Sequence, residues 1–89
     1  MNVETVRTKI KEIIADVGDL EVSEIADDAS FVEDLDLDSL SNLEIGVDVN
    51  DAFKLGFPEG QLQKLKTVED AVQIVLARLQ ELESQGEVA

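Results

Sequence analysis

The segment that organises the fold spans residues 34–44 and reads Asp34-Leu35-Asp36-Leu37-Asp38-Ser39-Leu40-Ser41-Asn42-Leu43-Glu44. Its first half alternates acids with leucines, and its second half begins a pattern of apolar residues at helical spacing. Ser39 lies where the two halves meet. Either Asp38 or Ser39 could cap the helix that starts here. Because a helix N-terminus also favours an attached or bound phosphate, the sequence leaves both a capping and a functional role open for Ser39.

The helix predicted for residues 39–53 carries apolar side chains on two sides. One stripe consists of Ile45, Val49, Ala52 and Phe53. The second stripe consists of Leu40, Leu43 and Val47, with Glu44, Asp48 and Asp51 beside it. A peripheral helix of a small bundle buries only one broad face. We therefore expect the second stripe to be an exposed protein-binding surface edged by carboxylates, the alternative being that a loop covers it.

Three other segments have helical patterns. We expect Asn2 to cap a first helix that ends at Gly18. Pro58 can open a short third helix over residues 59–64 that turns Leu62 and Leu65 inward. Thr67 precedes the last long helix, which should end near residue 82 before a frayed tail. The apolar positions of the first and last helices are Val3, Val6, Ile10, Ile13, Ile14, Val17, Val68, Ala71, Val72, Val75, Leu76, Leu79 and Leu82.

The connection over residues 19–38 lacks a sustained period. A loop of this length in a small domain needs its own apolar residues to hold it, and Ile25, Phe31 and Leu35 are the predicted anchors. The fold class predicted is all-α: a four-helix bundle with three longer helices, one short third helix and a long first loop. The 89 residues form a single domain with an ordered core over residues 2–82.

Composition excludes several classes of function. The chain has no Cys and no His, which excludes disulfides, thiolate metal sites, a Cys nucleophile and a His base. Its formal net charge of −14 opposes binding to nucleic acid and to anionic membranes. No apolar run is long enough for membrane insertion and no signal pattern is present, so we expect a cytoplasmic protein, and a monomer.

Two known functional motifs, the calcium-binding EF-hand loop and the serine-hydrolase site, are incomplete in this sequence. The spacing Asp34-x-Asp36-x-Asp38 resembles the start of a calcium loop, but Ser39 and Ile45 stand where an EF-hand needs Gly and Glu. No specific metal site is therefore predicted. A serine hydrolase lacks its usual base, and no Gly-x-Ser-x-Gly motif occurs. The chain is not expected to be an enzyme.

The run Leu37-Asp38-Ser39-Leu40, followed by Leu43-Glu44 and Phe53, resembles the signature of the acyl carrier protein family. Phe57-Pro58 and Thr67-Val68 are similar to the family's steps into its third and last helices. The resemblance implies a right-handed four-helix bundle without catalysis of its own. It also implies that a phosphopantetheinyl transferase, using coenzyme A and Mg²⁺, esterifies Ser39 with 4′-phosphopantetheine. The thiol of that arm would carry acyl thioesters for fatty acid or polyketide-type biosynthesis.

The resemblance also implies roles for other residues. Asp38 would orient the modifying enzyme or the phosphate. A recognition helix would dock on basic patches of acyl transferases, ketosynthases and reductases through Leu40, Leu43, Glu44, Val47, Asp48 and Asp51. An acyl-chain cavity would be lined by Ile45, Val49, Phe53, Leu62, Leu65, Val72 and Val75.

Five positions depart from the family pattern. Two of them, Asn50 and Ala52, thin the acidic run that often ends the recognition helix. Asp36 replaces a frequent Gly, Asp48 replaces a small apolar residue, and Gly46 replaces a bulkier aliphatic one. These departures favour a specialised pathway over a housekeeping role in fatty acid synthesis. The alternatives are a carrier for an aminoacyl or unusual starter unit, and an acidic helical adaptor that binds basic partners without being modified.

Overall fold

The computed structural model describes residues 2–56 and 66–86, and side chains as far as residue 83. Its elements in chain order are α1 (Val3–Gly18), the 3₁₀ helix η1 (Val22–Glu24), α2 (Ser39–Phe53) and α4 (Val68–Gly86). Within these ranges the chain is helical, with one isolated bridge and no strand. The all-α prediction is confirmed. The short third helix, with Leu62 and Leu65, lies outside the described residues.

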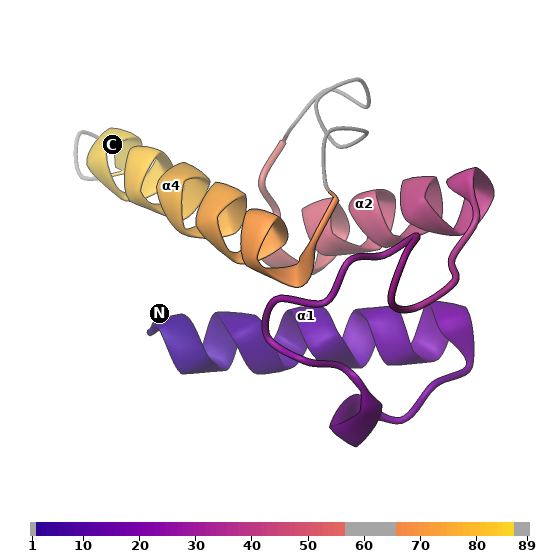
Figure 1. Ribbon diagram of the computed structural model, residues 1–89. Helices are drawn as coiled ribbons and strands as arrows, with labels where there is room; N and C mark the ends of the chain where they lie inside the picture. Colours follow the sequence, from indigo (N-terminus) through magenta and orange to yellow (C-terminus); the bar gives the residue numbers. More distant parts are fainter. Residues whose placement is uncertain (1, 57–65, 87–89) are drawn as a thin grey trace.

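Helix α1 is the base on which the other two long helices pack. Figure 1 shows α1 running beneath α4 at one end and beneath α2 at the other. The first loop (residues 19–38) leaves the end of α1, passes through η1 and crosses the bundle to reach the start of α2 (Figure 1). This path brings the start of α2, and with it Ser39, to one end of the molecule.

The ends of α1 follow from local chemistry. The Asn2 side chain caps the helix as predicted, accepting a hydrogen bond from the Thr5 N–H at 2.8 Å. At the other end Asp19, rather than Gly18, adopts the left-handed conformation, with φ of 57°. Gly18 leaves room for the first loop: a Cβ at this position would lie 2.9 Å from Leu37 Cδ2, and the Leu37 side chain would have to shift. The first loop therefore packs directly against the backbone at the end of α1.

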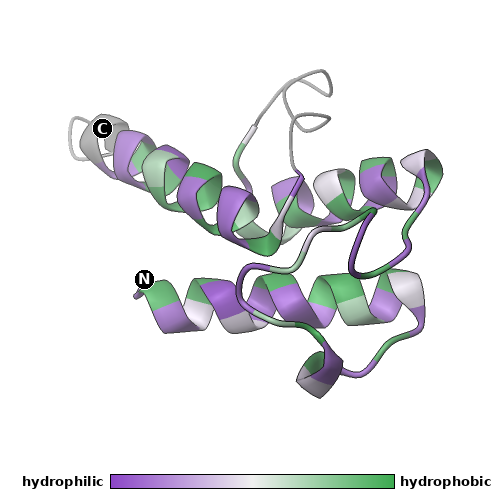
Figure 2. Ribbon diagram, in the orientation of Figure 1, coloured by the Kyte–Doolittle hydropathy of each residue, from purple (hydrophilic) through white to green (hydrophobic). Residues whose placement is uncertain are grey.

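The core consists of aliphatic side chains with two phenylalanines, Phe31 and Phe53, and centres on the facing sides of the three helices. Hydrophobic and hydrophilic stretches alternate along each helix, as amphipathic packing requires (Figure 2). Of the predicted loop anchors, Ile25 and Phe31 are buried and Leu35 is half-buried. The prediction that Ala52 belongs to the buried stripe is wrong, because Ala52 is exposed in the last turn of α2. The buried set is Val6, Ile10, Ile14, Ala15, Ile25, Ala29, Phe31, Leu37, Ile45, Val49, Phe53, Leu55, Val68, Ala71, Val72 and Val75.

Backbone hydrogen bonds fix the first loop to the segment that enters α4. The Phe31 N–H donates to the Lys66 carbonyl at 2.9 Å, and the Val68 N–H donates to the Ala29 carbonyl at 3.0 Å. The Leu37 N–H then donates to the Phe31 carbonyl at 2.8 Å. Since Phe31 is fully buried between these bonds, the loop is held by both its backbone and its side chain.

Two cations of α1 hold the loop and α4 by ion pairs. Arg7 binds Glu69 of α4 at 3.1 Å and lies 4.0 Å from Asp27 of the loop. Lys11 Nζ donates to the Asp27 carboxylate. Lys11, with a further contribution from Arg7, lowers the pKa of Asp27. Hydrogen bonds from Gln73 and Arg7 likewise lower the pKa of Glu69.

These shifts predict a loss of stability in acid. A carboxyl whose pKa is lower in the folded than in the unfolded chain stabilises the fold above its unfolded pKa, and this contribution disappears as the pH falls through the folded pKa. We therefore expect the urea midpoint to fall below about pH 4. Lys11→Met, which removes the main partner of Asp27, should make that fall shallower. Lys9→Met is the matched control, because Lys9 is exposed and makes no ion pair within the described residues. Identical acid profiles for the two variants would contradict this prediction.

Asp36 occupies a backbone conformation that suits glycine. Its φ is 55°, in the left-handed region, just before the turn into α2. This conformation disfavours most L-residues, although Asp and Asn tolerate it better than others. Asp36, which replaces the Gly that the resemblance leads us to expect, is therefore one of the few residue types that tolerate this conformation.

Asp36→Gly is expected to stabilise the domain by about 0.5–1 kcal/mol, because relief of the left-handed strain exceeds the added entropy of the unfolded chain. Thermal unfolding should shift upward by roughly 2–8 °C for a domain of this size. Asp36→Asn removes the same charge while keeping a side chain. An equal gain in the Asn variant would show that charge, not backbone strain, is the cause.

Candidate functional site

The capping role that the sequence left open belongs to Asp38. Its backbone is extended, with φ of −87° and ψ of 178°, and its Oδ1 accepts a hydrogen bond from the Ser41 N–H at 2.8 Å. The hydrogen bonds from Ser41 lower the pKa of Asp38, so this carboxylate stays ionised at neutral pH. Ser39 is consequently the first residue of α2 rather than its cap, and its hydroxyl is not needed to start the helix.

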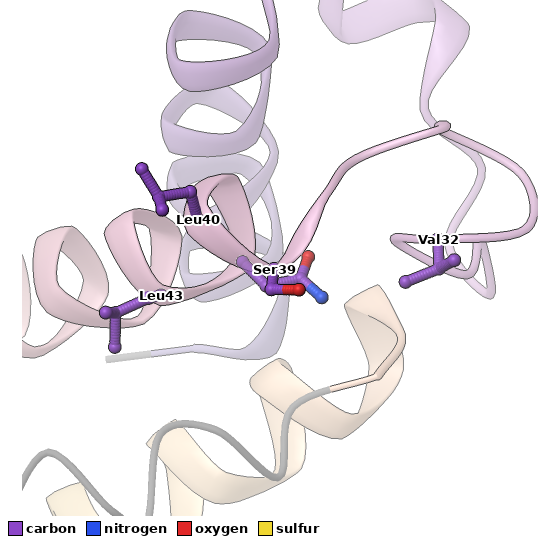
Figure 3. Close-up of a pocket in the computed structure, with 5 residues that line it drawn as sticks. Val32, Ser39, Leu40 and Leu43 are labelled. Atoms are coloured by element: carbon purple, nitrogen blue, oxygen red, sulfur yellow. The ribbon is translucent and has the colours of Figure 1, made fainter.

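Ser39 presents an exposed hydroxyl beside a hollow. No hydrogen bond of its side chain occurs within the described part of the chain. The hollow has a volume of about 450 Å³ and is lined by Val32, Ser39, Leu40, Asn42 and Leu43. Figure 3 shows Ser39 at the start of α2, with Val32 facing it from the first loop. A group attached to Ser39 would have both free access to solvent and an adjacent surface to contact.

The second apolar stripe of α2 is exposed, as predicted. Leu40 is 79% exposed, Leu43 36% and Val47 38%. Glu44 and Asp51 are exposed beside the stripe and Asp48 is half-buried. The first loop does not cover this face. We call these six residues the docking stripe.

Comparison with known proteins agrees with this geometry. Residues 8–75 match the family model described as the phosphopantetheine attachment site. The chain is 39% identical over 83 residues to an acyl carrier protein of Rhodococcus erythropolis, covering 93% of this chain and 87% of that protein.

The chain belongs to the acyl carrier protein family.

Other acyl carrier proteins with similar sequences serve different pathways by name. The polyketide-8 synthase acyl carrier protein 2 of Streptomyces avermitilis is 36% identical over 73 residues, covering 82% of this chain and 84% of that protein. The meromycolate extension acyl carrier protein of Mycobacterium tuberculosis is 44% identical over 77 residues, covering 86% and 64% respectively. These relatives place the chain among carrier proteins of fatty acid or polyketide-type biosynthesis, with covalently attached 4′-phosphopantetheine as cofactor.

The residues beside Ser39 fit this cofactor. An acyl carrier protein needs a nucleophilic oxygen that a transferase can reach, and the Ser39 hydroxyl is exposed and unbonded within the described residues. The hollow next to it combines apolar side chains with the amide of Asn42, which suits an arm that has both methyl and amide groups. The carboxylate of Asp38 is occupied with the helix cap and does not engage Ser39.

The described members of the predicted acyl cavity form part of one core. Ile45, Val49 and Phe53 of α2 are buried together with Val72 and Val75 of α4. Leu62 and Leu65 lie outside the described residues. Leu55 is also buried, at 1% exposure, although no periodic pattern of apolar residues indicates its burial. It follows Lys54, whose left-handed conformation ends α2 and turns Leu55 back into the core.

The described part of the chain has neither a metal-binding cluster nor a helix suited to a membrane. Among residues 2–56 and 66–86 no cluster of three or more acidic side chains is arranged to hold a metal ion. None of the helices in the same ranges is long and apolar enough to cross a membrane.

Proposed function

We propose that Ser39 is the attachment residue of a discrete acyl carrier protein. A phosphopantetheinyl transferase would use coenzyme A and Mg²⁺ for the transfer. The Ser39 oxygen forms a bond to phosphorus, the pyrophosphate linkage of coenzyme A breaks, and adenosine bisphosphate leaves while a base of the transferase takes the hydroxyl proton. The observation that carries this proposal is the separation of roles at the start of α2: Asp38 caps the helix, and the Ser39 hydroxyl stays exposed and unbonded.

The terminal thiol of the arm supplies the reactive group that this chain lacks, and it holds acyl groups as thioesters. The protein itself is then a non-catalytic, cytoplasmic and monomeric substrate of its partner enzymes. The absence of Cys and His from the whole sequence supports a carrier whose reactive thiol comes from the arm, because neither a thiol nor an imidazole is available for catalysis by the chain.

Partner enzymes would dock on the docking stripe. Its leucines and valine give an apolar centre, and Glu44 and Asp51 give a negative edge that suits basic patches on acyl transferases, ketosynthases and reductases. Such contacts between opposite charges accelerate association and weaken as salt is added. The buried side chains of α2 and α4 would move apart to admit the acyl chain of a loaded thioester.

Intact-mass measurement tests the attachment. The purified protein is incubated with coenzyme A, Mg²⁺ and a broad-specificity phosphopantetheinyl transferase, with a known carrier modified alongside. We expect the mass to rise by one phosphopantetheine, and peptide mapping to place it on Ser39. An unchanged mass in a folded sample, with the known carrier modified, would reject the proposal and favour the unmodified acidic adaptor.

A further inference from the structure

The hollow beside Ser39 contains a polar atom without a partner. Asn42 is half-buried, and its Oδ1 is enclosed with no hydrogen bond. Exchanging the positions of Oδ1 and Nδ2 would leave an enclosed donor in place of an enclosed acceptor. Because Oδ1 is enclosed, a ligand in the hollow cannot reach it. The amide group that the hollow can offer is Nδ2, which is not enclosed and makes no hydrogen bond within the described residues.

The rest of the lining is apolar and unusually exposed. Val32 on the first loop is 58% exposed, and Leu40 and Leu43 on α2 are 79% and 36% exposed. Asn42 lies three residues after Ser39, so both side chains share one face of α2. The hollow of about 450 Å³ falls within the range of small-molecule pockets, roughly 300–1,000 Å³.

The proximal half of 4′-phosphopantetheine has groups that match this lining. A methylene group joins its phosphate to a carbon that bears two methyl groups. A hydroxyl-bearing carbon follows, and then two amides that both donate and accept hydrogen bonds. An arm attached to Ser39 therefore starts at the hollow and presents methyl groups first and an amide next. Ion pairing is not required, which matters because the phosphate lies among carboxylates.

We propose that the hollow is a resting site for the prosthetic arm. The methyl groups contact Val32 and Leu43, and an amide of the arm hydrogen-bonds to the side chain of Asn42. The arm then exchanges between a docked and a free state, and a partner enzyme takes it from the docked state in a defined direction. Asn42 is a positioning residue in this scheme. The inference rests on the proposed attachment at Ser39.

Nuclear magnetic resonance of the loaded protein tests the resting site. Isotope-labelled protein is loaded with an unlabelled arm, and its mass is checked first. We expect isotope-filtered contacts between the arm methyl protons and the methyl groups of Val32 and Leu43. We also expect amide shift changes between unloaded and loaded protein at Val32 and Asn42, beyond the residues that flank Ser39.

Three variants sharpen the test. Asn42→Leu removes the hydrogen bond at similar volume and should lower the ratio of docked to free arm by roughly 2- to 12-fold. Val32→Ser removes an apolar side chain on the first-loop side of the hollow, and should also lower the ratio of docked to free arm. Val22→Ser is the matched control, since Val22 is also an exposed valine of the first loop, at 39%, and does not line the hollow. Spectra of the unloaded variants establish that each one folds, and Val32→Ser alone suffices if Asn42→Leu does not.

The outcomes distinguish the two proposals. Loading at Ser39 with shift changes confined to its immediate neighbours would overturn the resting site and leave the carrier function intact. Contacts that persist unchanged in Asn42→Leu would overturn the role of Asn42. No loading at all would overturn both the resting site and the proposed function.

Discussion

Ser39→Ala is expected to abolish phosphopantetheine loading completely while leaving the fold unchanged. The hydroxyl is the proposed nucleophile, and alanine cannot replace it. The same hydroxyl makes no hydrogen bond within the described residues, and the helix cap is supplied by Asp38. Since alanine is a good helix former, the free energy of unfolding should stay within about 0.5 kcal/mol of the original. Intact mass and a thermal melt measure the two effects on one sample.

Ser41→Ala is the matched control for this loss. Ser41 lies two residues later in the same helix, and its backbone N–H, which bonds to Asp38, is retained in the variant. It should load as the original protein does. Loading of Ser39→Ala would contradict attachment at Ser39. Loss of loading in Ser41→Ala, with the fold intact, would also contradict it.

Phe31→Ala is expected to remove about 3–5 kcal/mol of stability. Phe31 is fully buried, and its backbone is bonded to Lys66 on one side and Leu37 on the other. Removal of the ring leaves a cavity that this clamped segment cannot close. Because small native domains are stable by only about 5–15 kcal/mol, much of the fold's stability would be lost. The midpoint of urea unfolding measures the effect.

The neighbouring residue provides the control for Phe31. Val32 is 58% exposed, so Val32→Ala should change stability by no more than about 0.5 kcal/mol. A small effect of Phe31→Ala, comparable with that of Val32→Ala, would show that the first loop can detach without unfolding the bundle.

The sequence predicts the bounds of a helix correctly where the spacing of apolar residues and a capping residue indicate the same start. The bounds of α2, residues 39–53, were predicted correctly because two apolar stripes begin directly after an acid that can cap a helix. The exposure of Leu40, Leu43 and Val47 followed from the same geometry, since one helix cannot bury two opposite faces. Only the structure distinguishes Asp38 from Ser39 as the N-cap of α2, because both residue types can accept the capping hydrogen bond.

The spacing of apolar residues does not indicate other features of the structure, such as which residues outside the helical pattern are buried. Leu37 is buried at 7% exposure because it packs against Gly18, a contact across the first loop that local spacing does not encode. Ala52 is exposed although Val49 and Phe53, before and after it, are buried, because at about 100° per residue it lies at the edge of the stripe. The enclosed oxygen of Asn42 is likewise a tertiary property, and no pattern in the sequence distinguishes it from a solvated amide.

The charged residues that hold the fold together are not those that edge the docking stripe. Arg7 and Lys11 bind acids of the first loop and α4, where their loss would weaken the fold. The carboxylates of Glu44 and Asp51 on α2 make no ion pair or side-chain hydrogen bond within the described residues. The acids of the proposed docking stripe can therefore vary without disturbing the architecture, since no ion pair or side-chain hydrogen bond within the described residues depends on Glu44 or Asp51. Relatives that are 36–44% identical to this chain are named for different pathways, which agrees with such independence.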